Sequence, residues 1–347
     1  MRLRIHGCYS EIDLDVKLLL KRGALLAAAN WQTVAMQFVV ETTFQVLLGV
    51  PVIGASILVA VLLGRDLGLL LQGSMRDILA SVASALMSEP IAFAAFAAAF
   101  AFAVMGGSVL AFLAKGGTMT VLIDANETAG PIERGPITYD ALKSAARFSM
   151  VRFVDGCGRL ARPYIRLGFV LMAVYAASGS AYLMLAVYGF RIAGEGLPFV
   201  GWGVMVAILA VGLVLWITLV NLVYLLLQIS IGIEGGGLTE ACRSVGAFAR
   251  EQRNGLGQIF LIVLGMLVAA TFASTLAWSG VGLIAFVPLV GLAVFPLQIL
   301  ALVIRGLVFE YLGLTALGAY VTLYRRHLLA RRASDRAQTV ESVVAIG

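Results

Sequence analysis

The feature that most constrains the fold is a series of apolar stretches, each of about 20 residues or more, that recur between clusters of charged residues. A helix of that length crosses the hydrocarbon of a bilayer and satisfies its own backbone hydrogen bonds. Alternating segments of roughly ten residues, which are typical of a transmembrane β-barrel, do not occur. The sequence therefore predicts an all-α fold, a polytopic transmembrane helical bundle.

Composition supports this class, because 61% of the residues are hydrophobic and only 13% are charged, whereas charged residues make up about a quarter of a soluble protein. The apolar stretches predict six spans, at about 31–63, 91–123, 167–190, 199–233, 258–279 and 297–324. The apolar segment 281–296 contains Pro288 and Pro296. It is compatible with a tight loop and with a short re-entrant segment.

Four further segments mix charged and apolar residues at helical spacing, which is typical of helices that lie at a membrane surface. These predicted interfacial helices are at about 12–28, 65–88, 138–161 and 238–252. We expect residues 1–333 to form a single transmembrane domain and 334–347 to form a disordered tail.

Two of the interfacial segments resemble each other. From Asp140 and from Glu240, an acid, Ala, a base, Ser and Phe recur at the same places. Because each of these elbows lies between two spans, we expect an internal span-elbow-span repeat, 91–190 and 199–280. Thr138 is placed to be the N-cap of the first elbow. In the second elbow we expect an apolar stripe of Leu238, Cys242, Val245 and either Phe248 or Ala249.

The distribution of basic residues predicts the orientation. Of the 25 Lys and Arg residues, 21 lie on one side of a six-span chain, in 1–22, 115–166, 235–257 and 325–347. Three lie on the other side, namely Arg65, Arg76 and Arg191, and the remaining one, Arg305, lies inside the sixth span. The positive-inside rule then puts both termini and both elbows in the cytoplasm, and we expect a bacterial inner membrane. The net charge of +6 is explained by this arrangement, so we expect no nucleic-acid partner.

Motifs for catalysis or for metal binding are missing. The sequence has two histidines and no Cys-x-x-Cys, His-Glu-x-x-His or Walker-type loop, so we assign no catalytic, cofactor-binding or metal-binding residue. Asp124, Asn126 and Glu127 offer oxygens to a hard cation, but such sites need six or more ligands. A turn with solvated charges is the favoured interpretation.

Ionisable residues inside the spans are the candidate intramembrane charge cluster: Glu41, Arg305 and Glu310. Such groups cost at least a few kcal/mol in hydrocarbon and normally face a partner or a wet cavity. The favoured interpretation is an ion pair of Glu41 and Arg305 that joins the first span to the last. A substrate or proton site is the alternative, and Arg305 is also placed to snorkel to the surface.

Basic residues of the elbows are candidate contacts for anionic lipid headgroups: Lys143, Arg147, Arg243 and Arg250. Gly235, Gly236 and Gly237 precede a helix N-terminus, where backbone N–H groups favour a phosphate. Glu234 and Glu240 would repel that phosphate. A flexible turn is therefore the favoured interpretation of the glycines.

The segments 137–144 and 238–244 carry a resemblance to a family. The order of span, elbow and span is similar to that of uncharacterised bacterial six-helix membrane proteins, including the membrane domain of some glycerophosphodiester phosphodiesterases. The resemblance implies a fold and no catalytic residues. We expect a non-enzymatic accessory or scaffold protein whose partners are membrane lipids and other membrane subunits. A transporter or lipid-translocating protein with a Glu41, Arg305 and Glu310 site is the alternative, and an enzyme acting on lipid comes third.

Overall fold

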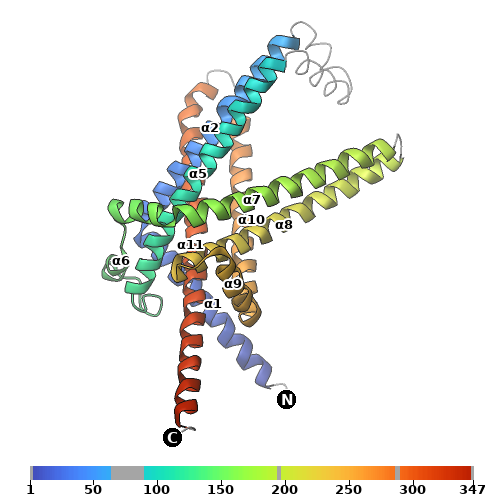
Figure 1. Ribbon diagram of the computed structural model, residues 1–347. Helices are drawn as coiled ribbons and strands as arrows, with labels where there is room; N and C mark the ends of the chain where they lie inside the picture. Colours follow the sequence, from blue (N-terminus) through green and yellow to red (C-terminus); the bar gives the residue numbers. More distant parts are fainter. Residues whose placement is uncertain (1–2, 64–89, 194–196, 286–289, 345–347) are drawn as a thin grey trace. The chain divides into compact units, whose positions relative to one another are not determined.

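The computed structural model describes residues 3–63, 90–193, 197–285 and 290–344, and over these residues the fold is all-α (Figure 1). The helices are α1 (Leu3–Ala29), α2 (Trp31–Leu63), α5 (Pro90–Thr128), α6 (Tyr139–Ala145), α7 (Met150–Ala193), α8 (Leu197–Glu234), α9 (Leu238–Glu251), α10 (Arg253–Ala285) and α11 (Val290–Val344). Six of the described helices, α2, α5, α7, α8, α10 and α11, are long and apolar enough to cross a membrane. The predicted fold class, a polytopic helical membrane protein, is confirmed.

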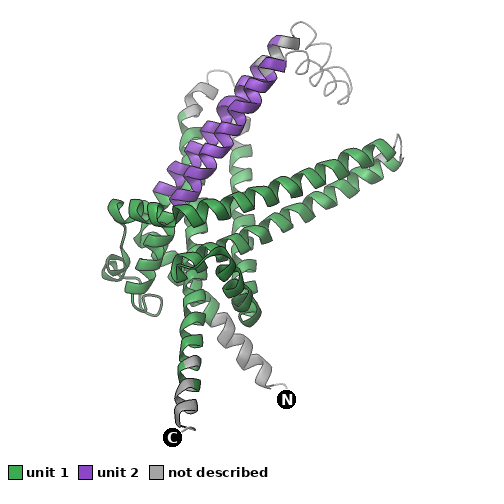
Figure 2. Ribbon diagram, in the orientation of Figure 1, with its two compact units in different colours: residues 1–35, 115–347 green, residues 36–114 purple. Residues whose placement is uncertain are grey.

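The chain divides into two compact units, coloured separately in Figure 2. Unit 2 comprises residues 36–114 and contains most of α2 and the first part of α5. In this unit the Phe44 ring lies against Gly107, where a Cβ would overlap it. Unit 1 comprises residues 1–35 and 115–347 and contains all the other helices.

Unit 1 consists of a region of buried residues, which we call the hub, and two pairs of helix ends that contain no buried residue, which we call arms. In α8 none of the residues 200–223 is buried, whereas Tyr224 and all of 226–231 are. In α11 none of 296–313 is buried, and all of 314–324 are. The first arm is 172–192 with 200–223, and the second is 264–279 with 296–313. At 1.5 Å per residue, 200–223 is about 36 Å long, close to the thickness of a bilayer's hydrocarbon core.

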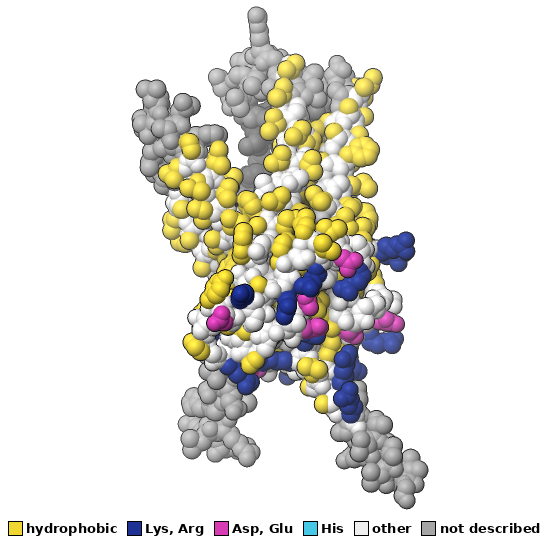
Figure 3. Space-filling view, turned by 90° about the vertical axis from the view of Figure 1, so that its left-hand side faces the viewer, with side chains coloured by type: hydrophobic (Ala, Val, Ile, Leu, Met, Phe, Trp, Pro, Cys, Tyr) yellow, Lys and Arg dark blue, Asp and Glu magenta, His cyan; other side chains and the backbone are white. Residues whose placement is uncertain are grey.

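The hub comprises the buried parts of α1, α5, α7, α8, α9, α10 and α11. Glycines allow its helices to approach closely, because a Cβ would collide with the neighbouring backbone. On Gly23 of α1 a Cβ would overlap the carbonyl oxygen of Thr315 in α11. On Gly117 of α5 it would lie 2.7 Å from the carbonyl oxygen of Phe153 in α7. Charged side chains gather in one zone of the face in Figure 3, and hydrophobic side chains cover the long helices beyond it.

In the first arm, α7 and α8 are joined by a series of polar contacts from aromatic side chains. Tyr182 donates a hydrogen bond to the carbonyl oxygen of Val206, and Trp202 Nε1 donates to the carbonyl oxygen of Ala186 at 3.2 Å. Trp216 Nε1 donates to Ser178 Oγ at 3.1 Å. These bonds fix the register of two helices whose outer faces are apolar and exposed.

Several helix bounds differ from those predicted. The segment 138–161 is not one interfacial helix, because α6 ends at Ala145 and α7 begins at Met150 and continues through the third span. Residues 12–28 belong to α1, whose apolar residues Leu19 and Leu26 are buried in the hub. Apart from residues 286–289, the segment 281–296 is helical, because α10 and α11 extend into it. The predicted helix 65–88 lies outside the described residues.

The C-terminal segment 334–347, predicted to be a disordered tail, is described as helix through Val344, the last residue of α11. The segment contains Ala, Arg, Gln and Glu residues, which favour helix, and neither Pro nor Gly before Gly347. No break therefore separates it from the span.

Candidate functional site

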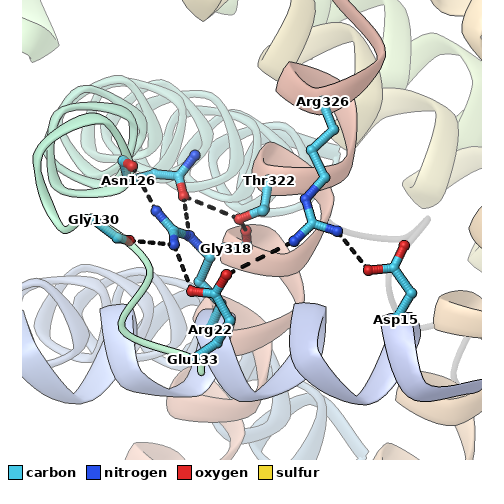
Figure 4. Close-up of polar contacts among 8 residues, drawn as sticks. All are labelled: Asp15, Arg22, Asn126, Gly130, Glu133, Gly318, Thr322 and Arg326. Carbon is cyan, nitrogen blue, oxygen red and sulfur yellow. Dashed lines mark hydrogen bonds and ion pairs between the residues drawn. The ribbon is translucent and has the colours of Figure 1, made fainter. Parts of the chain in front are cut away.

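Arg22 is the centre of a buried polar cluster in the hub, drawn in Figure 4. Its Nε donates to Asn126 Oδ1 at 2.7 Å, and its Nη2 donates to the Asn126 carbonyl oxygen at 2.8 Å. Its Nη1 donates to the Gly130 carbonyl oxygen and to Glu133 Oε2, each at 2.6 Å. All three guanidinium nitrogens are thus bonded to the end of α5 and the loop that follows it.

Gly130 presents its carbonyl oxygen because of its backbone conformation. Its φ is +60°, in the left-handed region where a residue with a side chain is strained. A glycine at this place is typical of a helix C-terminus, and α5 ends at Thr128. The turn that ends α5 therefore also supplies a hydrogen-bond acceptor for Arg22.

The cluster continues to α11. Thr322 Oγ1 donates to Asn126 Oδ1 at 3.1 Å and also lies 2.8 Å from the Gly318 carbonyl oxygen. Arg326 forms an ion pair of 2.6 Å with Asp15 of α1 and lies 3.8 Å from Glu133. The cluster therefore joins α1, the end of α5 and α11, three segments that are far apart in the sequence.

A cavity of about 490 Å³ lies beside this cluster. Its lining includes three arginines and two glutamates, namely Arg22, Arg325, Arg326, Glu127 and Glu133. Each of these charges is already paired, since Arg325 bonds to Glu127 and Glu133 bonds to Arg22. These ion pairs therefore hold the helices together.

Asp124, Asn126 and Glu127 do not share a cation site. They lie on the last turns of α5, and each bonds to a different arginine. Asp124 pairs with Arg152 at 2.9 Å, and Glu127 pairs with Arg325. The favoured interpretation of a solvated turn is wrong as well, because α5 extends through these residues.

Asn30 organises the junction of α1, α2 and α6. Its side chain is fully buried, and its Nδ2 donates to the carbonyl oxygens of Leu26 and Ala145 at 2.9 and 3.0 Å. Its Oδ1 accepts the backbone N–H groups of Arg147 and Phe148 at 2.8 and 3.0 Å. These bonds satisfy the backbone between α6 and α7, which explains how the predicted helix 138–161 can break there.

A second polar cluster joins α8, α9 and α11 around Glu234. Glu234 Oε1 accepts hydrogen bonds from Ser230 at 3.1 Å, from Ser244 at 2.8 Å and from Tyr324. Phe248 lies edge-on against Tyr324, with a ring separation of 5.0 Å. The cluster anchors α9 to the last span.

The turn between α8 and α9 is formed by the three glycines, as predicted. Gly235 has a φ of +69°, and the N–H of Gly237 donates to Glu240 Oε2 at 3.2 Å. Glu240 therefore occupies the anion position at the N-terminus of α9. This contact is consistent with a turn and leaves no free place for a phosphate at Gly237.

Of the predicted intramembrane charges, Glu41 belongs to unit 2, whereas Arg305 and Glu310 belong to unit 1, so their pairing stays a prediction. Glu41 and Arg305 have exposed side chains, and that of Glu310 is half-buried. The guanidinium carbon of Arg305 lies 5.8 Å from the centre of the Phe309 ring.

Of the predicted headgroup contacts, Lys143, Arg243 and Arg250 are exposed. Arg147 differs, because it is half-buried and its Nε donates to Thr128 Oγ1 at 2.8 Å. In α9 the buried stripe is Ala241, Val245 and Phe248. The prediction that Leu238 and Cys242 belong to this stripe is wrong, since both are exposed. Val245 and Phe248 are buried as predicted, and Ala241 takes the place of Cys242.

The chain matches no protein-family model, no curated protein and no solved structure. The interpretation of the hub therefore depends on its own chemistry.

The predicted site residues do not include four central residues of the two clusters, Arg22, Glu133, Glu234 and Tyr324, and Asn126 is considered only as an oxygen for a cation. One signal in the sequence was available for Arg22. It lies three residues after Leu19 and four before Leu26, so helical spacing places a charge inside an apolar stripe. A charge in such a stripe indicates a buried partner.

Proposed function

We propose that the protein is a non-enzymatic accessory or scaffold protein of a bacterial inner membrane, with its termini and elbows in the cytoplasm. In this proposal the hub organises lipid or a partner complex through its arms. One observation carries it: in α8 none of the residues 200–223 is buried, whereas all of 226–231 are. The apolar outer face of this helix end, away from α7, offers its surface to lipid tails or to the helices of another subunit.

The chemistry of the hub supports a structural role. Its most deeply buried charges, Arg22 and Glu133, bond to each other and to neighbouring protein groups. A transport pathway needs polar groups that can exchange their partners as a substrate passes. The distribution of Lys and Arg supports the orientation.

A transporter or lipid-translocating protein is the second candidate. The observation that favours it is the place of Arg305 and Glu310, which lie in the exposed part of α11 that forms the second arm. Ionisable side chains at membrane depth normally face a partner or a wet cavity. Glu41 is the residue that would complete this site.

Reconstitution into liposomes tests the two candidates. A scaffold gives no lipid flipping or ion flux above that of protein-free liposomes. A flux that is abolished by Arg305→Leu, and equally by Glu41→Gln, would replace the scaffold proposal by the transporter.

The scaffold role itself is tested by placing a photo-crosslinking amino acid at Ile208, on the exposed face of the first arm. In the native membrane we expect one discrete crosslinked protein species. The matched control is the same probe at Leu160, which is buried in the hub and should crosslink only within the chain. Crosslinking of Ile208 to lipid alone would exclude a protein partner at this arm.

A further inference from the structure

The outer side of α8 in the first arm carries a regular stripe of residues, none of which is buried: Val204, Ala207, Val211, Val214, Thr218 and Asn221. Val211 and Val214 are each 63% exposed. α7 runs beside α8 along this arm (Figure 1), and Trp202 of α8 donates a hydrogen bond to Ala186 of α7. Trp202 precedes Val211 by about two and a half helical turns and so lies on the opposite side of α8. The stripe therefore faces away from α7.

The spacing of the stripe alternates between three and four residues, which is the heptad repeat of a left-handed helix pair. Every position of the first kind, 204, 211 and 218, is a valine or a threonine, and β-branched residues there favour a parallel pair. The small side chain of Ala207 allows two helices to approach closely. From Val204 to Asn221 the stripe is about 26 Å long, which is most of a hydrocarbon core of about 30 Å. Its pattern and its length are those of a helix–helix interface in a bilayer.

Asn221 is the residue of the stripe that lipid tails cannot satisfy. It is exposed, and about 20 Å of helix separate it from Glu234, the only charged residue of α8. Its Oδ1 accepts a hydrogen bond from Tyr175 of α7, whereas its Nδ2 donates none to any residue that the structure describes. An amide N–H without a partner is costly in hydrocarbon. The outer side of the arm therefore requires a hydrogen-bond acceptor at this height.

A second copy of the chain would supply that acceptor. Two copies have the same orientation in a membrane, so their α8 helices would pair in parallel about a two-fold axis, with each stripe residue opposite its own counterpart. Asn221 would then meet the partner's Asn221, and each Oδ1 has a second lone pair for the Nδ2 of the other copy. A shift of the register by one heptad would instead place Asn221 against Val214 and leave both amides without an acceptor.

We propose that the first arm is the interface of a parallel dimer, in which the stripe from Val204 to Asn221 packs against the same stripe of a second copy. The proposal rests on the membrane placement in the proposed function, and it names the partner of the first arm. It accounts for both the heptad spacing and the exposed amide of Asn221.

Single cysteines test which face of α8 forms the interface. The background is Cys8→Ser, Cys157→Ser and Cys242→Ser, which leaves no other thiol. In this background we expect Val214→Cys to form a disulfide-linked dimer when membranes are treated with copper phenanthroline. The matched control is Gly212→Cys, which is also exposed and lies at nearly the same depth, but about 200° away around the helix. Gly212→Cys should give no dimer above that of the cysteine-free background.

The role of the amide is tested by the dissociation constant of the dimer in liposomes, measured by energy transfer between labelled copies as the protein is diluted with lipid. Asn221→Leu should raise this constant by roughly tenfold, because it removes interhelical hydrogen bonds within the membrane. The matched control, Tyr175→Phe, removes the hydrogen bond within the arm and keeps the amide, so the dimer should be retained. If Asn221→Leu does not fold, Ala207→Phe places a bulky ring at an exposed position of the stripe and should also raise the constant.

Equal crosslinking of Val214→Cys and Gly212→Cys would overturn the interface, as would a chain that stays monomeric in liposomes. A dissociation constant that Asn221→Leu leaves unchanged would also overturn it. These outcomes leave the scaffold proposal intact, since a probe at Ile208 that crosslinks to a different protein still supports that role. Conversely, a flux abolished by Arg305→Leu would replace the scaffold by the transporter and would leave the dimer standing.

Discussion

Arg22 and Glu133 form an ion pair of 2.6 Å although their side chains are only 10% and 5% exposed. Removing two charges from water costs several kcal/mol for each ion, and this cost is offset only when further hydrogen bonds satisfy both groups. Asn126 and Gly130 supply those bonds to Arg22. The ion pair therefore joins α1 to the loop after α5 in one specific arrangement.

Arg22→Met should destabilise the protein by about 3–5 kcal/mol, because it leaves Glu133 buried without its partner. Glu133→Leu alone should have a similar effect, and the double change should recover a large part of the loss. The measurement is unfolding in detergent, followed by size-exclusion chromatography after heating. Arg331→Gln, an exposed arginine of α11, is the control and should shift stability by less than about 0.5 kcal/mol. If the losses of unfolding free energy were additive in the double variant, the two residues would not stabilise the protein as a pair.

Asn30→Leu should destabilise the junction between α6 and α7, since it leaves the N–H groups of Arg147 and Phe148 without an acceptor. A buried unsatisfied donor costs about 1–3 kcal/mol. Hydrogen exchange measures the effect locally, and we expect faster exchange at these two amides than in wild type. Asn30→Asp keeps an acceptor for these two amides but removes the donor to the Leu26 and Ala145 carbonyl oxygens and buries a charge, so we expect it to restore their protection only in part. Unchanged protection in Asn30→Leu would show that another group accepts the hydrogen bonds of the Arg147 and Phe148 amides.

Local signals and long-range contacts differ in how well the sequence predicts them. Apolar runs predict the six long helices, and Thr138 is the N-cap of α6, as its position before Asp140 indicates. The partners of Arg22 lie 104 to 111 residues away, and no local pattern identifies them. The break after Ala145 was not predictable for the same reason, because Asn30 stabilises it from another part of the chain.

Gly23→Ala should weaken the contact of α1 with α11, because the added Cβ would overlap the Thr315 carbonyl oxygen and lie 2.9 Å from the Ala319 nitrogen. Overpacking of this kind costs typically about 1–3 kcal/mol. Gly158→Ala is the matched control, since nothing lies within 4 Å of a Cβ at that helical position. Gly158→Ala should leave the free energy of unfolding unchanged or raise it by up to about 1 kcal/mol. Equal melting temperatures for the two variants would show that α1 does not depend on this close approach.

The orientation can be measured through Cys242, which is exposed on α9. In a Cys8→Ser and Cys157→Ser background it is the single thiol of the chain. Because the elbows carry the excess of basic residues, we expect a membrane-impermeant maleimide to label Cys242 in inverted vesicles and not in intact spheroplasts. Cys242→Ser with Arg191→Cys places the single thiol at the opposite end of α7, and its labelling should show the reverse pattern. Labelling of Cys242 in spheroplasts would place the elbows on the outside and would remove the support for a cytoplasmic hub.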